Sequence, residues 1–250
     1  MSNIFPKVSI ITVCYNTEKT IEKTIKSVLE QDYSNIEYII IDGLSSDRTL
    51  EIVNQYKSNI ACVISEKDSG VFDAMNKGLE KANGEYIWYL NADDQIYAPN
   101  TLSLAMENHK KEDFVYGKAI LVNESGVERK HEVRKAHPQA HKLSWRTLKD
   151  GMVICHQAML VKRSIVPKYN LKYEITGDLD WAINVLKRSN SFRDTGLYMC
   201  RFVEGGISTV NRKASLIQRF QILCAHYGVF TTVWRHFIFL LKAIKRGTIR

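Results

Sequence analysis

The first hundred residues alternate between short apolar runs and segments with apolar side chains at helical spacing, and this alternation limits the folds open to the chain. The apolar runs have strand length and are rich in β-branched residues. They cover 8–14, 36–41, 60–64 and 85–90. Strands that are apolar along their whole length are buried on both faces. The pattern therefore predicts an α/β protein with a parallel sheet between helices.

The second half of the chain has a less regular pattern. Short strands are expected at 114–116 and 119–122, an exposed charged loop from 126 to 142, an apolar run at 152–161 and a helix at 179–188. No internal repeat or linker is evident. We interpret the chain as one continuous α/β domain followed by a C-terminal helical appendage.

Charge is distributed unevenly. The net charge is +8, yet the last acidic residue is Glu204, and residues 205–250 carry eight Lys or Arg. The preceding body is neutral, whereas a nucleic-acid-binding protein more often spreads basic residues over its folded surface. We therefore expect no nucleic-acid partner.

Several other classes lose support. The five cysteines form no close pair, which favours a reducing compartment, and the N-terminus has no leader pattern. The longest uncharged stretch of the tail, 220–234, is shorter than the roughly 20 residues of a membrane-spanning helix. Pro138 separates His137 from His141, so no zinc site is expected. The glycine fingerprints of dinucleotide-binding and P-loop proteins are missing.

Polar residues follow three of the predicted strands. They occur in 12–16, 42–47 and 91–94. Ligands of parallel sheets bind beyond the carboxyl ends of the strands, so these segments predict a ligand site at one edge.

The segment Asn91-Ala-Asp-Asp is the sharpest of these signals. Two adjacent carboxylates repel each other unless a cation lies nearby, and Mg²⁺ commonly shares such oxygen sites with substrate phosphates. A solvated turn is the alternative. Asp42 could accept hydrogen bonds from a base or a ribose, although its segment also fits a turn in which Asp47 caps a helix.

Two further segments carry titratable groups. Asp178 and Asp180 lie at a predicted helix start, where one could act as a general base and where both also fit helix capping. His156 lies in an apolar run, where a core histidine is the commoner case.

Together these segments resemble the inverting glycosyltransferases of family 2, which have the GT-A fold. The resemblance runs from Val8 to about Arg188. It rests, in order, on VSIITVCYN, YIIIDGLSSDRT, SEKDSG, FDAMNKG, NADD, HQ and TGDLD.

The resemblance implies a mostly parallel, Rossmann-like nucleotide-binding sheet flanked by helices. It places a glycosyltransferase domain at 1–205, with a nucleotide-binding half at 1–105 and an acceptor half at 106–205. A basic amphipathic tail follows at 206–250.

The family motifs also imply roles for individual residues. Asp178 would be the catalytic base, with Asp180 supporting it, and Asp94 would hold Mn²⁺ or Mg²⁺. His156 and Gln157 would contact the acceptor or the diphosphate. The nucleotide and donor sugar would be bound by Thr12, Tyr15, Asn16, Asp42, Asp68, Asp73, Asn76 and Asp93.

Two positions depart from the family pattern. The metal motif usually begins with Asp, and here it begins with Asn91. The base motif often reads Glu-Asp, and here Gly177 precedes Asp178.

The implied reaction is transfer of a hexosyl or N-acetylhexosaminyl group, with inversion, from a nucleotide-sugar donor to an acceptor hydroxyl. A UDP-sugar is the favoured donor. A glycan or lipid-linked acceptor in bacterial surface-polysaccharide synthesis is expected from the family. The alternative is a non-catalytic, membrane-associated sugar-nucleotide-binding protein, which would not need Asp178.

The tail bears on location. Its apolar residues alternate with basic ones and include Trp234, as in segments that lie on anionic membrane surfaces. The alternative is a helix pair packed on the domain. We expect a cytoplasmic protein, peripheral at the inner face of the cell membrane.

Overall fold

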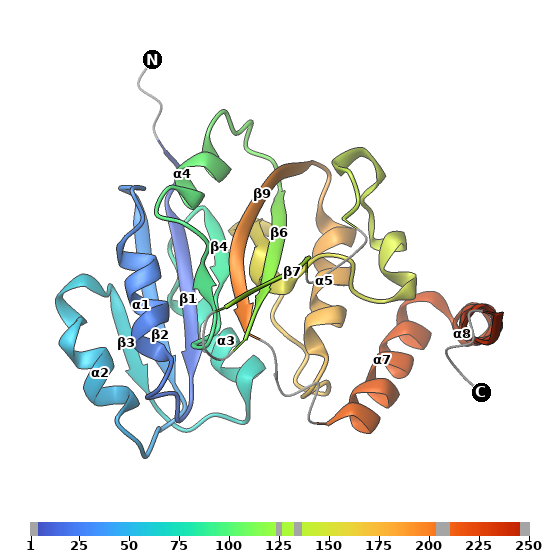
Figure 1. The fold of residues 1–250 in the computed structure, drawn as a ribbon, viewed down its shortest axis with the longest axis horizontal. Coiled ribbons are helices and arrows are strands. Elements are labelled where there is room, and N and C mark those ends of the chain that lie inside the picture. Colours follow the sequence, from blue (N-terminus) through green and yellow to red (C-terminus); the bar gives the residue numbers. More distant parts are fainter. Residues whose placement is uncertain (1–4, 124–126, 133–136, 204–210, 246–250) are drawn as a thin grey trace.

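The computed structural model describes residues 5–123, 127–132, 137–203 and 211–245. Its described strands form one nine-stranded sheet with the order β3-β2-β1-β4-β8-β6-β9-β5, in which β7 pairs with β6 (Figure 1). The strands are β1 Val8–Cys14, β2 Ile36–Asp42, β3 Cys62–Ser65, β4 Tyr86–Tyr89, β5 Gln95–Ile96, β6 Phe114–Val122, β7 Glu128–Glu132, β8 Met159–Lys162 and β9 Phe192–Val203.

The first half of the sheet is parallel, as predicted. β1 pairs in parallel with β2 and β4, and β2 pairs in parallel with β3. The second half is mixed, because β8 runs antiparallel to both β4 and β6. Parallel pairing thus holds in the first half and between β6 and β9 in the second half. The chain enters β8 at the edge where β4 ends, which brings the segment before β8 to the predicted ligand edge.

Two expectations for the second half are corrected. The two short strands predicted around Gly117 form one strand, β6. A side chain at Gly117 would lie 2.6 Å from the Leu197 carbonyl oxygen, so glycine lets β9 approach and the strand continues. The predicted loop at 126–142 contains β7 and a short 3₁₀ helix.

Helices cover both faces of the sheet. Side chains of α3, α5 and α7 pack on one face, and those of α1, α2 and α4 pack on the other. The α-helices are α1 Ile21–Leu29, α2 Thr49–Gln55, α3 Val71–Lys81, α4 Thr101–Met106, α5 Gly177–Arg188, α7 Arg212–Tyr227 and α8 Val229–Lys245. The 3₁₀ helices are η1 Lys57–Asn59, η2 Ala140–Lys142, η3 Trp145–Asp150, η4 His156–Ala158 and η5 Arg163–Ile165.

The two tail helices differ in their surroundings. Ile222 and Leu223 of α7 are buried in the core that contains α5, whereas α8 lies at the end of the molecule farthest from β3 (Figure 1). Gly228, with a φ of 84°, joins the two helices. Of the two alternatives for the tail, packing on the domain describes α7. No described helix is long and apolar enough to cross a membrane.

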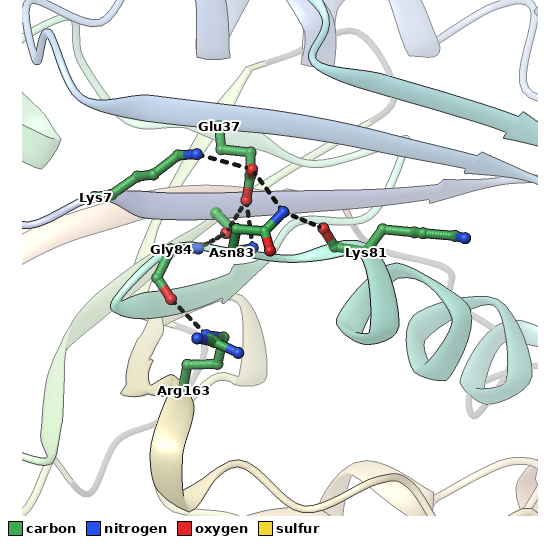
Figure 2. Close-up of polar contacts among 7 residues, drawn as sticks. Lys7, Glu37, Lys81, Asn83, Gly84 and Arg163 are labelled. Carbon is green, nitrogen blue, oxygen red and sulfur yellow. Dashed lines mark hydrogen bonds and ion pairs between the residues drawn. The ribbon is translucent and has the colours of Figure 1, made fainter.

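A buried carboxylate lies at the edge of the sheet where the parallel strands begin, opposite the predicted ligand edge. Glu37 of β2 is 7% exposed and accepts hydrogen bonds from the Ser9 hydroxyl at 2.6 Å and the Asn83 N–H at 2.7 Å (Figure 2). Lys7 pairs with its other oxygen at 2.9 Å. One side chain therefore links β1, β2 and the turn after α3.

The same network reaches β4 and η5. The Gly84 N–H donates to the Ser9 hydroxyl, and Arg163 donates to the Gly84 carbonyl at 2.9 Å (Figure 2). A side chain at Gly84 would lie 2.6 Å from the Ser9 nitrogen, so this close approach requires glycine.

The hydrogen bonds to Glu37 determine its ionisation. Burial alone would raise its pKa, but the bonds from Ser9, Asn83 and Lys7 outweigh burial and lower the pKa from 4.5 to about 2. A carboxyl group whose pKa is lower in the folded state stabilises the fold above its unfolded pKa, and this contribution is lost as the pH falls toward the folded pKa.

We predict that Glu37→Gln lowers the free energy of unfolding by roughly 2 kcal/mol at pH 7, because a charged acceptor of several buried donors is lost. The difference from the wild type should shrink as the pH falls from about 4.5 toward 2. Chemical denaturation at a series of pH values measures it, with the exposed Glu30→Gln as the control. A difference independent of pH would contradict this assignment.

Candidate active site

The loops after β1 and β2 are tied together by short polar side chains. The Asp42 carboxylate has no exposed surface and accepts bonds from the Ser45 N–H and the hydroxyls of Ser45 and Ser65. Asn16, in the left-handed region at a φ of 52°, accepts the Ser46 N–H at 2.8 Å. These bonds fix the shape of the predicted nucleotide edge.

The residues predicted to bind the nucleotide differ in their exposure to solvent. Tyr15, 62% exposed, and Asn16 present surface. Thr12 does not, because its position in β1 directs it into the core that contains α1, where its hydroxyl accepts a bond from Tyr38 at 3.1 Å. Thr12 and Asp42 are buried and hydrogen-bonded within the protein, and their expected contacts with the nucleotide stay a prediction.

The loop before α3 and the first turn of this helix carry one predicted donor ligand each, Asp68 and Asp73. Asp68 accepts the Gly70 N–H at 2.9 Å, and Asp73 accepts the Ser69 N–H at 3.0 Å. Both carboxylates therefore organise the loop before the helix. They remain partly exposed at the carboxyl edge of the sheet.

Asn76 joins α3 to the segment before α5. Its amide group donates to the Tyr169 carbonyl at 3.0 Å and accepts the Tyr169 N–H at 2.7 Å. Asn76 is 8% exposed. Both ends of the amide thus fasten the segment before α5 to α3, and the expected contact of Asn76 with the sugar or diphosphate stays a prediction.

Asp94 is the least satisfied charged group at this edge. It is 1% exposed, and Oδ1 accepts the Val203 N–H at 3.0 Å. No hydrogen bond of ordinary geometry reaches Oδ2, although the Gln157 side chain lies near enough to oppose the rise in the Asp94 pKa, and Oδ1 of Asn91 is also buried without a partner. Burial, and then the charge of Asp93, raise the pKa of Asp94 well above its usual range. Burial also raises the pKa of Asp93.

These oxygens fit the group that the family motif implies. A divalent cation would satisfy the unpartnered oxygens and reverse the cost of keeping Asp94 ionised. The described residues contain no cluster of three His, Cys, Asp or Glu that could enclose a metal. The donor set therefore suits a hard cation that takes further ligands from water and substrate phosphates.

His156 and Gln157 form η4 at the same edge, and both are almost fully buried. Burial lowers the pKa of His156 to about 4, so its ring is neutral near pH 7. The ring stacks on Tyr89 and its Nε2 is hydrogen-bonded to the Tyr169 hydroxyl. The backbone carbonyl group of Gln157 accepts the Trp88 indole N–H at 2.8 Å. His156 is therefore a core histidine and offers no positive charge to a diphosphate.

The two acids at the start of α5 face different surroundings. Asp178 is half-buried, accepts the Leu179 N–H at 2.9 Å, and contributes to the raised pKa of Tyr169, which is due mainly to burial. Its turn packs against Phe72 of α3, which a side chain at Gly177 would contact at 2.9 Å.

Asp180 points instead toward α7. Its Oδ1 is 2.7 Å from Nε2 of His226, and its Oδ2 accepts the Asn184 amide at 3.3 Å. The carboxylate of Asp180 thus bonds to the tail helix, and its support of Asp178 stays a prediction.

Comparison with known proteins gives these residues a context. The family described as Glycosyl transferase family 2 matches residues 9–169. The chain belongs to glycosyl transferase family 2.

Curated relatives of this family 2 protein are also named as glycosyltransferases. A "PGL/p-HBAD biosynthesis glycosyltransferase" of Mycobacterium bovis is 31% identical over 187 residues, which cover 71% of this chain and 69% of the relative. The "Putative teichuronic acid biosynthesis glycosyltransferase TuaG" of Bacillus subtilis is 43% identical over 98 residues, 38% of this chain and 39% of that protein.

Solved structures confirm the fold class. TarS of S. aureus in complex with UDP aligns with a TM-score of 0.64 at 18% identity, covering 88% of this chain and 70% of that one. The mannosyltransferase PcManGT of Pyrobaculum calidifontis, in complex with GDP-Man and Mn²⁺, aligns with a TM-score of 0.62 at 18% identity over 92% and 74%. The glycosyltransferase thus has the α/β GT-A architecture.

Sequence reasoning missed four residues that shape this glycosyltransferase site. The Val203 N–H binds Asp94, Tyr169 connects α3 to His156, and Gln218 and His226 of α7 reach the start of α5. A backbone donor carries no sequence signal. The spacing of Gln218, Ile222 and His226, four residues apart, does place them on one helix face.

Proposed function

We propose that this protein transfers a sugar, with inversion, from a nucleoside-diphosphate sugar to an acceptor hydroxyl. The observation that carries the proposal is the buried, unpartnered Asp94 oxygen at the carboxyl edge of the sheet. Burying an unpaired charge is costly, so such a group is retained where a ligand supplies the missing partner. A UDP-sugar is the proposed donor, supported by the TarS complexes with UDP and UDP-GlcNAc.

Two groups of this chain would handle the donor. Asp94, with Asp93 and Asn91 beside it, would hold Mg²⁺ or Mn²⁺, and the ion when bound would neutralise the charge that develops on the leaving diphosphate. Tyr15 and Asn16 would contact the nucleotide, because they present surface beside the folded Asp42 loop. Asp68 and Asp73 would lie near the donor sugar.

Asp178 would remove the proton from the acceptor hydroxyl. Its carboxylate is half-exposed at the start of α5, whereas Asp180 is committed to α7. Attack by the activated oxygen on the face opposite the leaving diphosphate inverts the anomeric centre. General-base catalysis of this kind contributes roughly 10²–10⁴ in rate.

The acceptor is proposed to be a glycan or a lipid-linked sugar of a bacterial surface. The printed names of the relatives support it, since they concern PGL/p-HBAD and teichuronic acid biosynthesis. A lipid-linked acceptor agrees with a peripheral position at the inner membrane face, for which α8 offers an apolar surface.

The apolar surface of α8 lies on consecutive turns. Its exposed side chains are Val229 at 62%, Phe230 at 85%, Val233 at 50%, Trp234 at 56%, Phe237 at 48% and Leu241 at 45%. Arg235 of this helix is paired with Asp150 of η3. Aromatic residues beside basic charge are typical of helices that lie in the membrane interface.

For the donor and the metal, we predict that one of UDP, GDP, dTDP and CDP raises the thermal unfolding midpoint, and that Mn²⁺ enlarges the rise. Ligand at 100 times its Kd adds about 2.7 kcal/mol of stability. Asp94→Asn should abolish the metal-dependent part. It should not lower the midpoint of the free protein, because it removes a buried, destabilising charge. An equal, metal-independent shift in both proteins would exclude Asp94 as the ligand.

For the base, we predict that Asp178→Asn lowers release of nucleoside diphosphate from the donor by two to four powers of ten and leaves the nucleotide-induced thermal shift nearly unchanged. The assay supplies acceptors as a bacterial lipid and glycan extract. The exposed Asp32→Asn serves as the matched control. Wild-type turnover in Asp178→Asn would remove Asp178 from the mechanism.

For the membrane, we predict that the double substitution Phe230→Ser and Trp234→Ser weakens binding to phosphatidylglycerol vesicles by about tenfold or more, since each aromatic ring loses its apolar burial. Co-sedimentation measures the binding. Leu104→Ser, at an exposed apolar residue of α4, is the control. Undiminished binding of the double variant to the vesicles would show that these side chains of α8 do not bind the membrane.

A further inference from the structure

The turn that begins α5 is capped by another helix. The N–H groups of Ile175 and Thr176 both donate to Oε1 of Gln218 in α7, at 3.0 and 3.2 Å. These two residues directly precede Gly177 and Asp178. The acceptor for the amides before the proposed base therefore comes from a segment more than forty positions later in the chain.

The N-cap residue of α5 makes no capping bond with its side chain. This residue is Thr176, and its hydroxyl is buried without a hydrogen-bond partner. A helix start needs acceptors for its free N–H groups, and a local Ser, Thr or Asp commonly supplies one. Here Gln218 provides the acceptor just before the helix.

A second contact fastens the turn on its other side. Nε2 of His226 is 2.7 Å from Asp180, two residues beyond Asp178. Lys187 lies 2.8 Å from Nδ1 of the same ring. Because an ammonium group can only donate, Nδ1 accepts, and Nε2 carries the hydrogen that Asp180 accepts. Both Asp180 and His226 are about nine-tenths buried, so this contact is shielded from water.

The two contacts share a rigid support. Gln218, Ile222 and His226 are spaced four residues apart on α7, and Ile222 between them is fully buried. The Tyr227 ring stacks on the Trp145 ring with the ring centroids 5.3 Å apart, and its hydroxyl donates to the Trp145 backbone carbonyl. The position of α7 on the body is therefore fixed independently of its two bonds to the α5 turn.

We propose that Gln218 and His226 are positioning residues that hold the Asp178 carboxylate in place for proton removal. This inference rests on the proposed role of Asp178 as the base. A misplacement of about 1 Å is enough to cost roughly a hundredfold in rate, so loss of either contact lowers turnover without removing any group that touches substrate.

The chain offers matched variants. Gln218→Met keeps the size of the side chain and removes the acceptor, whereas Gln218→Glu keeps it. His226→Gln keeps a donor near the place of Nε2, whereas His226→Leu removes it. Gln221→Met, at an exposed glutamine of the same helix, is the control. We expect kcat to fall about ten- to hundredfold in Gln218→Met and His226→Leu, with the donor KM nearly unchanged. Gln218→Glu and His226→Gln should retain most of the wild-type kcat.

The decisive measurement repeats Gln218→Met and His226→Leu in the Asp178→Asn background. Residues that act by placing Asp178 have little further effect once that carboxylate is gone. An equal fractional loss of kcat in both backgrounds would show a general weakening of the fold and overturn the proposal. Wild-type kcat in both single variants would overturn it as well.

The turnover of Asp178→Asn alone distinguishes failure of the proposed base from failure of the positioning role of α7. If that variant retains full turnover, the proposed base is wrong, and the positioning proposal falls with it. If that variant loses turnover while the α7 variants do not, the proposed function stands and only the positioning role fails. Hydrogen exchange of the Ile175 and Thr176 amides, faster in Gln218→Met and not in Gln218→Glu, checks that the intended contact was removed.

Discussion

Helices cover both faces of the sheet, and this leaves polar side chains two main places, the edges where the strands begin and end. Each edge holds a buried carboxyl group with a shifted pKa, Glu37 at one and Asp94 at the other, and the two shifts have opposite directions. Glu37 has a full set of donors and a pKa lowered to about 2. Asp94 keeps an unpartnered oxygen and a raised pKa. The edge with Glu37 is structural, because the oxygens of this carboxylate accept hydrogen bonds from the protein. The edge with Asp94 is the proposed ligand site, because one oxygen of this carboxyl group has no such partner.

The sequence predicts the parallel half of the fold because those strands are apolar at nearly every position. It misses β9, in which polar and half-buried residues alternate with little period, and it breaks β6 at Gly117. Glycine usually ends a strand, and only the neighbouring backbone of β9 shows why this one does not. A local pattern cannot supply that information.

The site was predictable in type and less so in detail. Motif order placed Asp94 and Asp178 at the ligand edge, since strand ends and helix starts are local features. It did not show whether a polar side chain already has a partner within the protein. Asn76 is bonded to Tyr169, 93 positions away, and Asp180 is bonded to His226. Residues of these types bind ligands in many sites, so only their distant contacts reveal that here they hold segments together.

The joint between α7 and α8 is a single glycine, Gly228, in a left-handed conformation. Ile222 and Leu223 of α7, before this glycine, are buried in the core, whereas the helix after it exposes Val229, Phe230, Val233, Trp234, Phe237 and Leu241. In the function proposed above, α8 sets where the protein acts, and the helices and strands before Gly228 carry the reaction. A lineage could exchange the final helix for a different anchor, and so move the same reaction to another surface, without altering a residue of the catalytic body.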